Sequence, residues 1–168
     1  MQAPDPFTLG TMAVDALERI AFIMSEVSEI EDLPEPLTPT RCARISISGV
    51  AEGRIWLESD DAFVCELAAG MLGNEPEETD ADTEGQMALA ELANIVGGSL
   101  AEALGGADHE HRLGLPESVD GEGPATADGN ATADADAKPD GHLETHVVAE
   151  LGTLRMTWVP VSSNRAAA

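Results

Sequence analysis

Basic residues are nearly missing from this chain of 168 residues. Lysine occurs once, at Lys138, and Lys and Arg together number 8 against 32 acidic residues. The resulting formal net charge of −24 repels phosphate backbones and anionic lipid, so it argues against nucleic acid or a membrane surface as a partner. A single lysine also excludes a lysine cluster for phosphate binding.

Cysteine, aromatic residues and long apolar runs are scarce as well. The two cysteines, Cys42 and Cys65, predict free thiols in a reducing compartment rather than a disulfide. With three Phe, two Trp and no Tyr, the core must be built from aliphatic side chains. No stretch reads as a signal peptide or a membrane-spanning helix. We therefore expect a cytoplasmic location.

Recognisable metal-binding patterns are also missing. The histidine pairs His109/His111 and His142/His146 carry no neighbouring cysteine and fit no standard zinc spacing. The acidic runs lack the alternating spacing and central glycine of a calcium loop. The sequence therefore predicts neither a metal site nor a cofactor of its own.

The apolar pattern predicts one α+β domain over residues 11–161. A flexible lead over residues 1–10 and a flexible tail over residues 162–168 are expected to flank it. Inside the domain, the first helix is expected to begin at a Thr11 cap and to run to about Val27.

The other expected elements suggest a sheet built from hairpins. Residues 117–141 are low in complexity and predict an acidic, disordered insertion. Each half of the chain offers a helix and then a hairpin, which is a weak internal repeat. Strands grouped in this way favour an antiparallel sheet with long helices packed on it. Strands are expected over 41–48, 54–58, 143–151 and 153–161, a short extended piece over 111–116, and further helices over 60–72 and 87–104.

One face of the last helix is the most informative feature of the chain. At about 100° per residue, Met87, Glu91, Asn94 and Gly98 fall within roughly 60° of one another. A carboxylate and an amide therefore project together from a face of mostly small residues. The buried side is predicted to be the opposite one, which carries Leu89, Leu92, Ala93, Val96, Leu100 and Ala103.

This helix, from Gly85 through Glu91-Leu-Ala-Asn94 to Gly98, resembles the signature helix of the CheC/CheX family of chemotaxis phosphatases. The family signature has Asp or Ser, then Glu four positions later, Asn three further on, and Pro some 22 positions beyond. Glu91, Asn94 and Pro116 match, whereas Met87 occupies the Asp/Ser position. Because alanine stands at Ala21, where the first helix would need the amide, the chain is most like the single-site CheX branch.

The resemblance implies a phosphatase that removes the aspartyl phosphate from a response-regulator receiver. Asn94 would position the attacking water through its amide oxygen, and Glu91 would pair with a receiver lysine. The divalent cation would belong to the receiver, and a homodimer is implied by analogy. The residues expected to contact the partner are Met87, Ala90, Gly98, Ala101 and Pro116.

Two alternatives stay open. A non-catalytic adaptor with the same fold would dock a receiver or a flagellar-switch-like component, and Met87 in place of Asp or Ser favours it. A dimerising stability module would have no receiver partner at all. A separate interpretation of the pattern is that Glu91 and Asn94 are ordinary solvated residues of an amphipathic helix.

Overall fold

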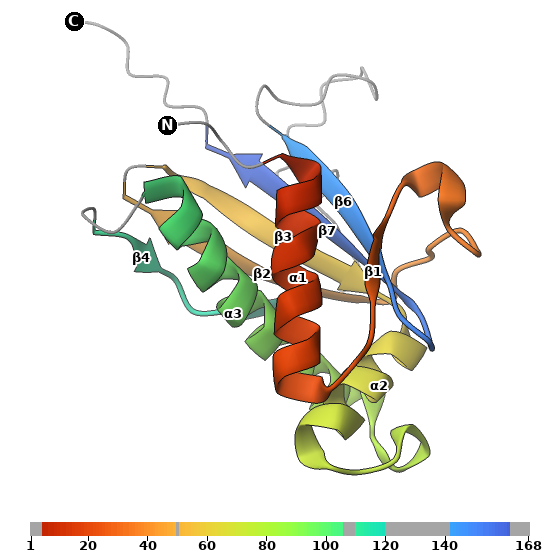
Figure 1. Ribbon diagram of the computed structural model, residues 1–168. Coiled ribbons are helices and arrows are strands. Elements are labelled where there is room, and N and C mark those ends of the chain that lie inside the picture. The colour runs from red at the N-terminus through yellow and green to blue at the C-terminus, as the bar shows by residue number, and fades with distance from the viewer. Residues whose placement is uncertain (1–4, 50, 106–109, 120–141, 162–168) are drawn as a thin grey trace, which may run out of the picture.

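The computed structural model describes residues 5–49, 51–105, 110–119 and 142–161. Within these residues, three α-helices lie against a seven-stranded antiparallel sheet (Figure 1). The helices are α1 (Pro6–Ala21), α2 (Asp61–Leu72) and α3 (Gln86–Gly105), and the strands are β1 (Glu26–Ser28), β2 (Arg41–Ser48), β3 (Gly53–Ser59), β4 (Arg112–Leu113), β5 (Glu117–Val119), β6 (Leu143–Val148) and β7 (Thr153–Pro160).

The strands are ordered β1-β6-β7-β3-β2-β4, and β5 also pairs with β2. Both predicted hairpins are confirmed: β2 pairs with β3, β6 pairs with β7, and β3 and β7 join them at the centre of the sheet. In Figure 1, α1 and α3 lie side by side on one face of the sheet, and α2 lies near one end. The predicted α+β class with an antiparallel sheet is therefore confirmed.

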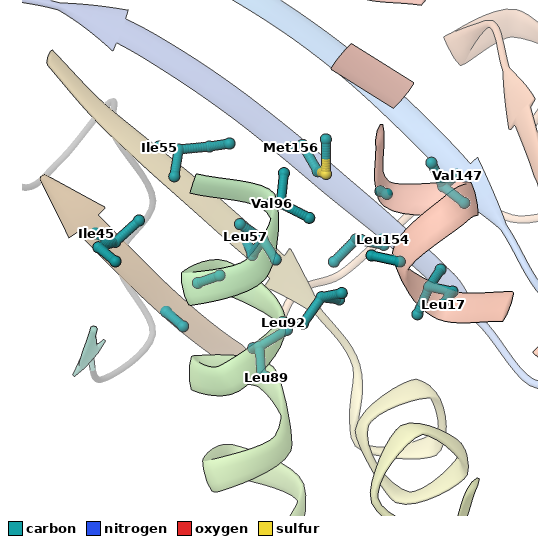
Figure 2. Packing of buried hydrophobic residues seen from close by; sticks show 14 of the residues in the cluster. Leu17, Ile45, Ile55, Leu57, Leu89, Leu92, Val96, Val147, Leu154 and Met156 are labelled. Carbon is teal, nitrogen blue, oxygen red and sulfur yellow. The ribbon is translucent and has the colours of Figure 1, made fainter. Parts of the chain in front are cut away.

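The core lies between this sheet face and the helices (Figure 2). Inward side chains of every second strand residue, among them Ile45, Leu57 and Met156, meet buried side chains of α3 such as Leu92 and Val96. Ala103, expected on the buried side of α3, is instead exposed. The segment Ala81–Gly105 is long and apolar enough to cross a membrane by length and composition. Its leucines and Val96 are buried and form part of this core.

The first helix has its cap six residues earlier than predicted, so the flexible lead over residues 1–10 is wrong for residues 6–10. Asp5 is the cap, and its carboxylate accepts a hydrogen bond of 2.7 Å from the Thr8 N–H. Pro6 fits the first helical position, where no N–H is needed. Thr11 does not cap the helix, because its hydroxyl donates to the Phe7 carbonyl within the first turns.

The first helix also ends earlier than predicted, at Ala21 rather than Val27. Phe22 adopts a left-handed conformation with φ of 58°. The Phe22 N–H donates to the Glu18 carbonyl, which is the hydrogen bond of an αL ending, and the Ile23 N–H donates to the Leu17 carbonyl. Val27 instead belongs to β1, which pairs with β6.

Two further sequence predictions fall near the end of the chain. Residues 117–119, predicted to begin a disordered insertion, form β5 and pair with Arg44, Ala43 and Cys42 of β2. Backbone pairing at the sheet edge therefore orders this part of the acidic segment. The rest of the predicted insertion, 120–141, and the predicted tail, 162–168, lie outside the described residues. Both cysteines are free thiols, as predicted.

Candidate functional site

A single π-helical turn, Ala81–Gly85, leads into α3 and fixes where that helix begins. The Asp80 carboxylate accepts hydrogen bonds from the N–H and the hydroxyl of Thr83, at 2.9 and 2.8 Å. In return, the Asp80 N–H donates to the Glu84 carboxylate at 3.0 Å. This reciprocal pairing satisfies donors that a helix start otherwise leaves unpaired. The Gln86 amide then donates to the Cys42 carbonyl at 2.9 Å, which ties the start of α3 to β2.

Two glycines allow α3 to lie close against its neighbours. A Cβ atom on Gly97 would come within 2.9 Å of the Ile45 side chain on β2, and one on Gly85 within 2.7 Å of Val64 on α2. Both distances are shorter than ordinary carbon–carbon contacts. The helix therefore lies close to the sheet and to α2, and this packing sets the position of its outward face.

The outward face of α3 carries the predicted site. Glu91 is exposed and Asn94 is half-buried, one turn apart. Met87 is 72% exposed, and Ala90 and Gly98 are half-buried beside the pair. No residue in the described part of the chain forms a hydrogen bond or an ion pair with the Glu91 or Asn94 side chain. The carboxylate and the amide therefore keep their hydrogen-bonding capacity for a partner.

The chain segment that joins β4 to β5 runs along the same side of α3. A Cβ atom on Gly98 would lie 3.8 Å from Leu113 of β4, so the outward face of α3 reaches this segment. Leu115, two residues on, is 85% exposed. Leu113 and Leu115 were missed as candidate surface residues, although their alternation within the predicted extended piece 111–116 was a usable signal.

Pro116 is half-buried in this edge segment. The Gly114 N–H donates to the Ser46 carbonyl on one side of it, at 2.8 Å. On the other side, Glu117 pairs with Arg44 through an ion pair of 2.6 Å. A proline is tolerated there because its missing N–H costs no ladder bond at a sheet edge.

Of the residues predicted to contact the partner, Ala101 alone is too buried to do so. It is only 4% exposed and belongs to the hydrophobic core. At about 100° per residue, residue 101 falls about 60° from residue 98 and about 20° from residue 94, so helix geometry alone places it beside the pair. The sequence placed it near the pair, but the packing removes it from any partner surface.

The chemistry available on this face is narrow. It offers one carboxylate and one amide, and the described residues contain no group of three His, Cys, Asp or Glu side chains that could hold a metal ion. An amide cannot act as a nucleophile or a base near neutral pH, but its oxygen accepts a hydrogen bond and its nitrogen donates two. The face is therefore suited to holding a water molecule or a partner's polar group in place.

Comparison with known proteins decides the family. Residues 41–134, more than half of the chain, match the family model for the chemotaxis phosphatase CheX. The chain belongs to the CheX family. The match spans β2 to β5 and so includes the exposed Glu91 and the half-buried Asn94. No protein of curated function matches the chain.

Solved CheX structures share the fold along almost the whole chain. The chemotaxis protein CheX of Vibrio vulnificus superposes with a TM-score of 0.65 at 16% identity, over 93% of this chain and 94% of that one. CheX of Desulfovibrio desulfuricans gives 0.64 at 14% identity, over 91% and 96%. A chain of the CheX–CheY–BeF3–Mg²⁺ complex of Borrelia burgdorferi gives 0.60 at 15% identity, over 93% and 97%. The resemblance to the CheC/CheX family, and to its CheX branch, is confirmed.

Proposed function

We propose that this CheX family member hydrolyses the aspartyl phosphate of a response-regulator receiver. The observation that carries the proposal is the outward face of α3, where Glu91 and Asn94 stand one turn apart with no partner among the described residues. The solved complex of a CheX with CheY, BeF3 and Mg²⁺ supports a receiver as the partner. The divalent cation would belong to that receiver.

In the proposed reaction, a water molecule attacks the phosphorus in line with the bond to the aspartate oxygen. That phosphorus–oxygen bond breaks, the aspartate leaves as a carboxylate, and inorganic phosphate is released with the proton from water. Phosphoryl transfer needs little covalent help from the protein, so positioning of the water can supply most of the acceleration. The Asn94 amide oxygen would accept a hydrogen bond from this water and fix its direction.

Glu91 would have a different role. Its exposed carboxylate lies one turn from Asn94. From there it would pair with a cationic side chain of the receiver while Asn94 faces the phosphate. Such an ion pair fixes the register of docking and thereby the position of Asn94. The rest of the contact surface would consist of Met87, Ala90, Gly98 and the edge segment with Pro116.

A second candidate function is a non-catalytic adaptor that binds a receiver without turnover. Met87 favours it, because a thioether that is 72% exposed cannot replace the hydrogen bond of an Asp or Ser at this position. Retention of both Glu91 and Asn94 favours the phosphatase. A homodimer and a cytoplasmic location stay predictions.

The decisive experiment follows the lifetime of a radiolabelled phospho-receiver from the same host, with and without this protein. Asn94→Ala should lose activity by about 10²-fold while binding is retained, because only the water is misplaced. Glu91→Ala should weaken binding. Glu18→Ala is the matched control, since Glu18 is exposed on a different helix, α1.

Each outcome separates the candidates. Unchanged phosphate lifetime with every receiver of the host would rule out the enzyme, and binding without turnover would establish the adaptor. Full activity in Asn94→Ala would show that the proposed mechanism is wrong. A gain in rate for Met87→Asp would show that the departure from the family signature limits catalysis.

A further inference from the structure

The turn that follows α1 exposes two large apolar side chains. Phe22, in its left-handed conformation, is 84% exposed, and Met24 is 88% exposed. Ile23 between them is buried in the core and anchors the turn. A left-handed conformation is unfavourable for a bulky residue, and the exposed positions of Phe22 and Met24 bring no packing within the chain that would offset it.

These two side chains line a hollow of about 340 Å³. The hollow lies between the turn after α1, the second half of α2 with the segment that follows it, and the turn between β6 and β7. In Figure 1 the end of α1 lies close to α2. Beside the hollow, Gly70 allows α2 to lie close to the end of α1, because a Cβ atom there would collide with the Ala21 carbonyl. The volume of the hollow is at the lower end of the range of ligand pockets, about 300–1,000 Å³.

The charged groups that line the hollow are all of one sign. Glu66 and Glu150 contribute carboxylates, and no Lys or Arg lines the hollow among the described residues. The Glu66 carboxylate accepts one hydrogen bond, of 3.1 Å, from the Leu151 N–H. Burial raises the pKa of Glu66, and so does the neighbouring Glu150. A cation placed at this point would stabilise both carboxylates.

From these features we infer that the hollow is a docking site for a protein segment in which an apolar side chain stands next to lysine or arginine. The apolar side chain would enter between Phe22 and Met24, and the cationic group would reach Glu66 and Glu150. Charge complementarity selects this occupant, because a neutral or acidic segment would leave the two carboxylates unpaired or repelled. The site contains no residue of α3, so it is separate from the face proposed to act on a receiver.

Methionine methyl groups give each surface its own reporter. Met24 lines the hollow, Met87 lies on the outward face of α3, and both are exposed. The full chain, carrying ¹³C-methyl methionine, would be titrated with a short amidated peptide that has two leucines one helical turn apart, flanked by arginines. We expect the Met24 signal to shift with saturation while the Met87 signal stays in place. A beryllofluoride-activated receiver should shift Met87 instead.

Matched variants test the specificity of the site. Phe22→Asn and Glu66→Gln should each weaken binding of the peptide by about tenfold, as expected for an anchor residue. Asp15→Asn removes the same single charge from an exposed position on α1 and should change affinity by less than about twofold. A peptide with glutamates in place of the arginines should not bind.

Several results would overturn the inference. Equal weakening by Asp15→Asn and Glu66→Gln would mean that the peptide binds only the overall negative field. A Met24 shift that depends on protein concentration without peptide would mean that a second copy of the chain fills the hollow. Saturable binding that leaves Met24 unmoved would place the peptide elsewhere. None of these results bears on the receiver experiment, which reads Met87 and phosphate lifetime.

Discussion

Replacement of Phe22 should reveal the conformational cost of the turn that follows α1. Its φ of 58° lies in the left-handed region, and its ring is 84% exposed. Phe22→Asn and Phe22→Val both remove the ring, but they differ in how well they tolerate this backbone conformation. Asparagine adopts it several-fold more often than most residues, whereas a β-branched valine is a genuine outlier there. The comparison of the two variants therefore isolates the backbone contribution.

The magnitudes follow from exposure and conformation. About one sixth of the residue is covered, which is on the order of 30 Å² and contributes about 0.8 kcal/mol. The left-handed conformation costs an L-residue about 1–2 kcal/mol. Relief of most of this cost should leave Phe22→Asn unchanged or up to about 1 kcal/mol more stable. Phe22→Val keeps the strain and loses the ring contact, so we expect a loss of about 1–2 kcal/mol.

Urea unfolding followed by tryptophan fluorescence measures both values, because Trp56 and Trp158 are buried and report on the core. The two midpoints should differ with unchanged slopes, and the melting temperatures should differ by about 2–4 °C per kcal/mol for a chain of this size. Equal stability of the two variants would refute the assignment of strain to this residue. A loss of more than about 2 kcal/mol in Phe22→Asn would show that the ring packs in solution.

Three further predictions concern buried groups. Gly70→Ala should destabilise the fold by about 1–3 kcal/mol in the same urea assay, since the new methyl group would meet the end of α1; wild-type stability would contradict the close packing of α1 and α2. Glu58 is buried, and its carboxylate binds the Arg155 guanidinium through two contacts of 2.8 Å. Glu58→Ala should therefore lower the free energy of unfolding by about 3 kcal/mol, and a loss below about 1 kcal/mol would mean that water reaches this pair. Burial raises the pKa of Cys42 to about 12, so this thiol stays protonated at pH 8.5. A thiol reagent should therefore modify half-buried Cys65 in the native protein, but Cys42 only after unfolding. Rapid reaction of both thiols would show that β2 opens.

Sequence patterns predicted the strands well because alternation is a direct consequence of one buried sheet face. The hairpins β2–β3 and β6–β7 match the predicted ranges within a few residues. The outward stripe on α3 was predictable for the same reason, since a helix that covers a sheet must turn its polar residues away. Met87, Glu91, Asn94 and Gly98 are all at least partly accessible.

Errors arose where local sequence offered two competing signals. Thr11 and Asp5 can both cap a helix, and the sequence alone does not show that Asp5-Pro6 supplies both a cap and a favourable first residue. The apolar spacing continued past Ala21 to Val27, yet β1 pairing with β6 ended the helix there. Ala101 was misplaced because small residues fit a close partner contact and a tight core equally well. Tertiary pairing and packing decided each case.

The two proposed surfaces have consequences for each other. A chain with a net charge of −24 repels an acidic receiver surface at long range, whereas the proposed ion pair of Glu91 acts only at close contact. A basic segment bound at Glu66 and Glu150 would add a second attraction, at a site separate from the outward face of α3. If that segment were covalently linked to the receiver, docking at α3 would become an intramolecular step at high effective concentration. Glu66→Gln would then weaken dephosphorylation of the linked receiver and leave that of an isolated receiver domain unchanged.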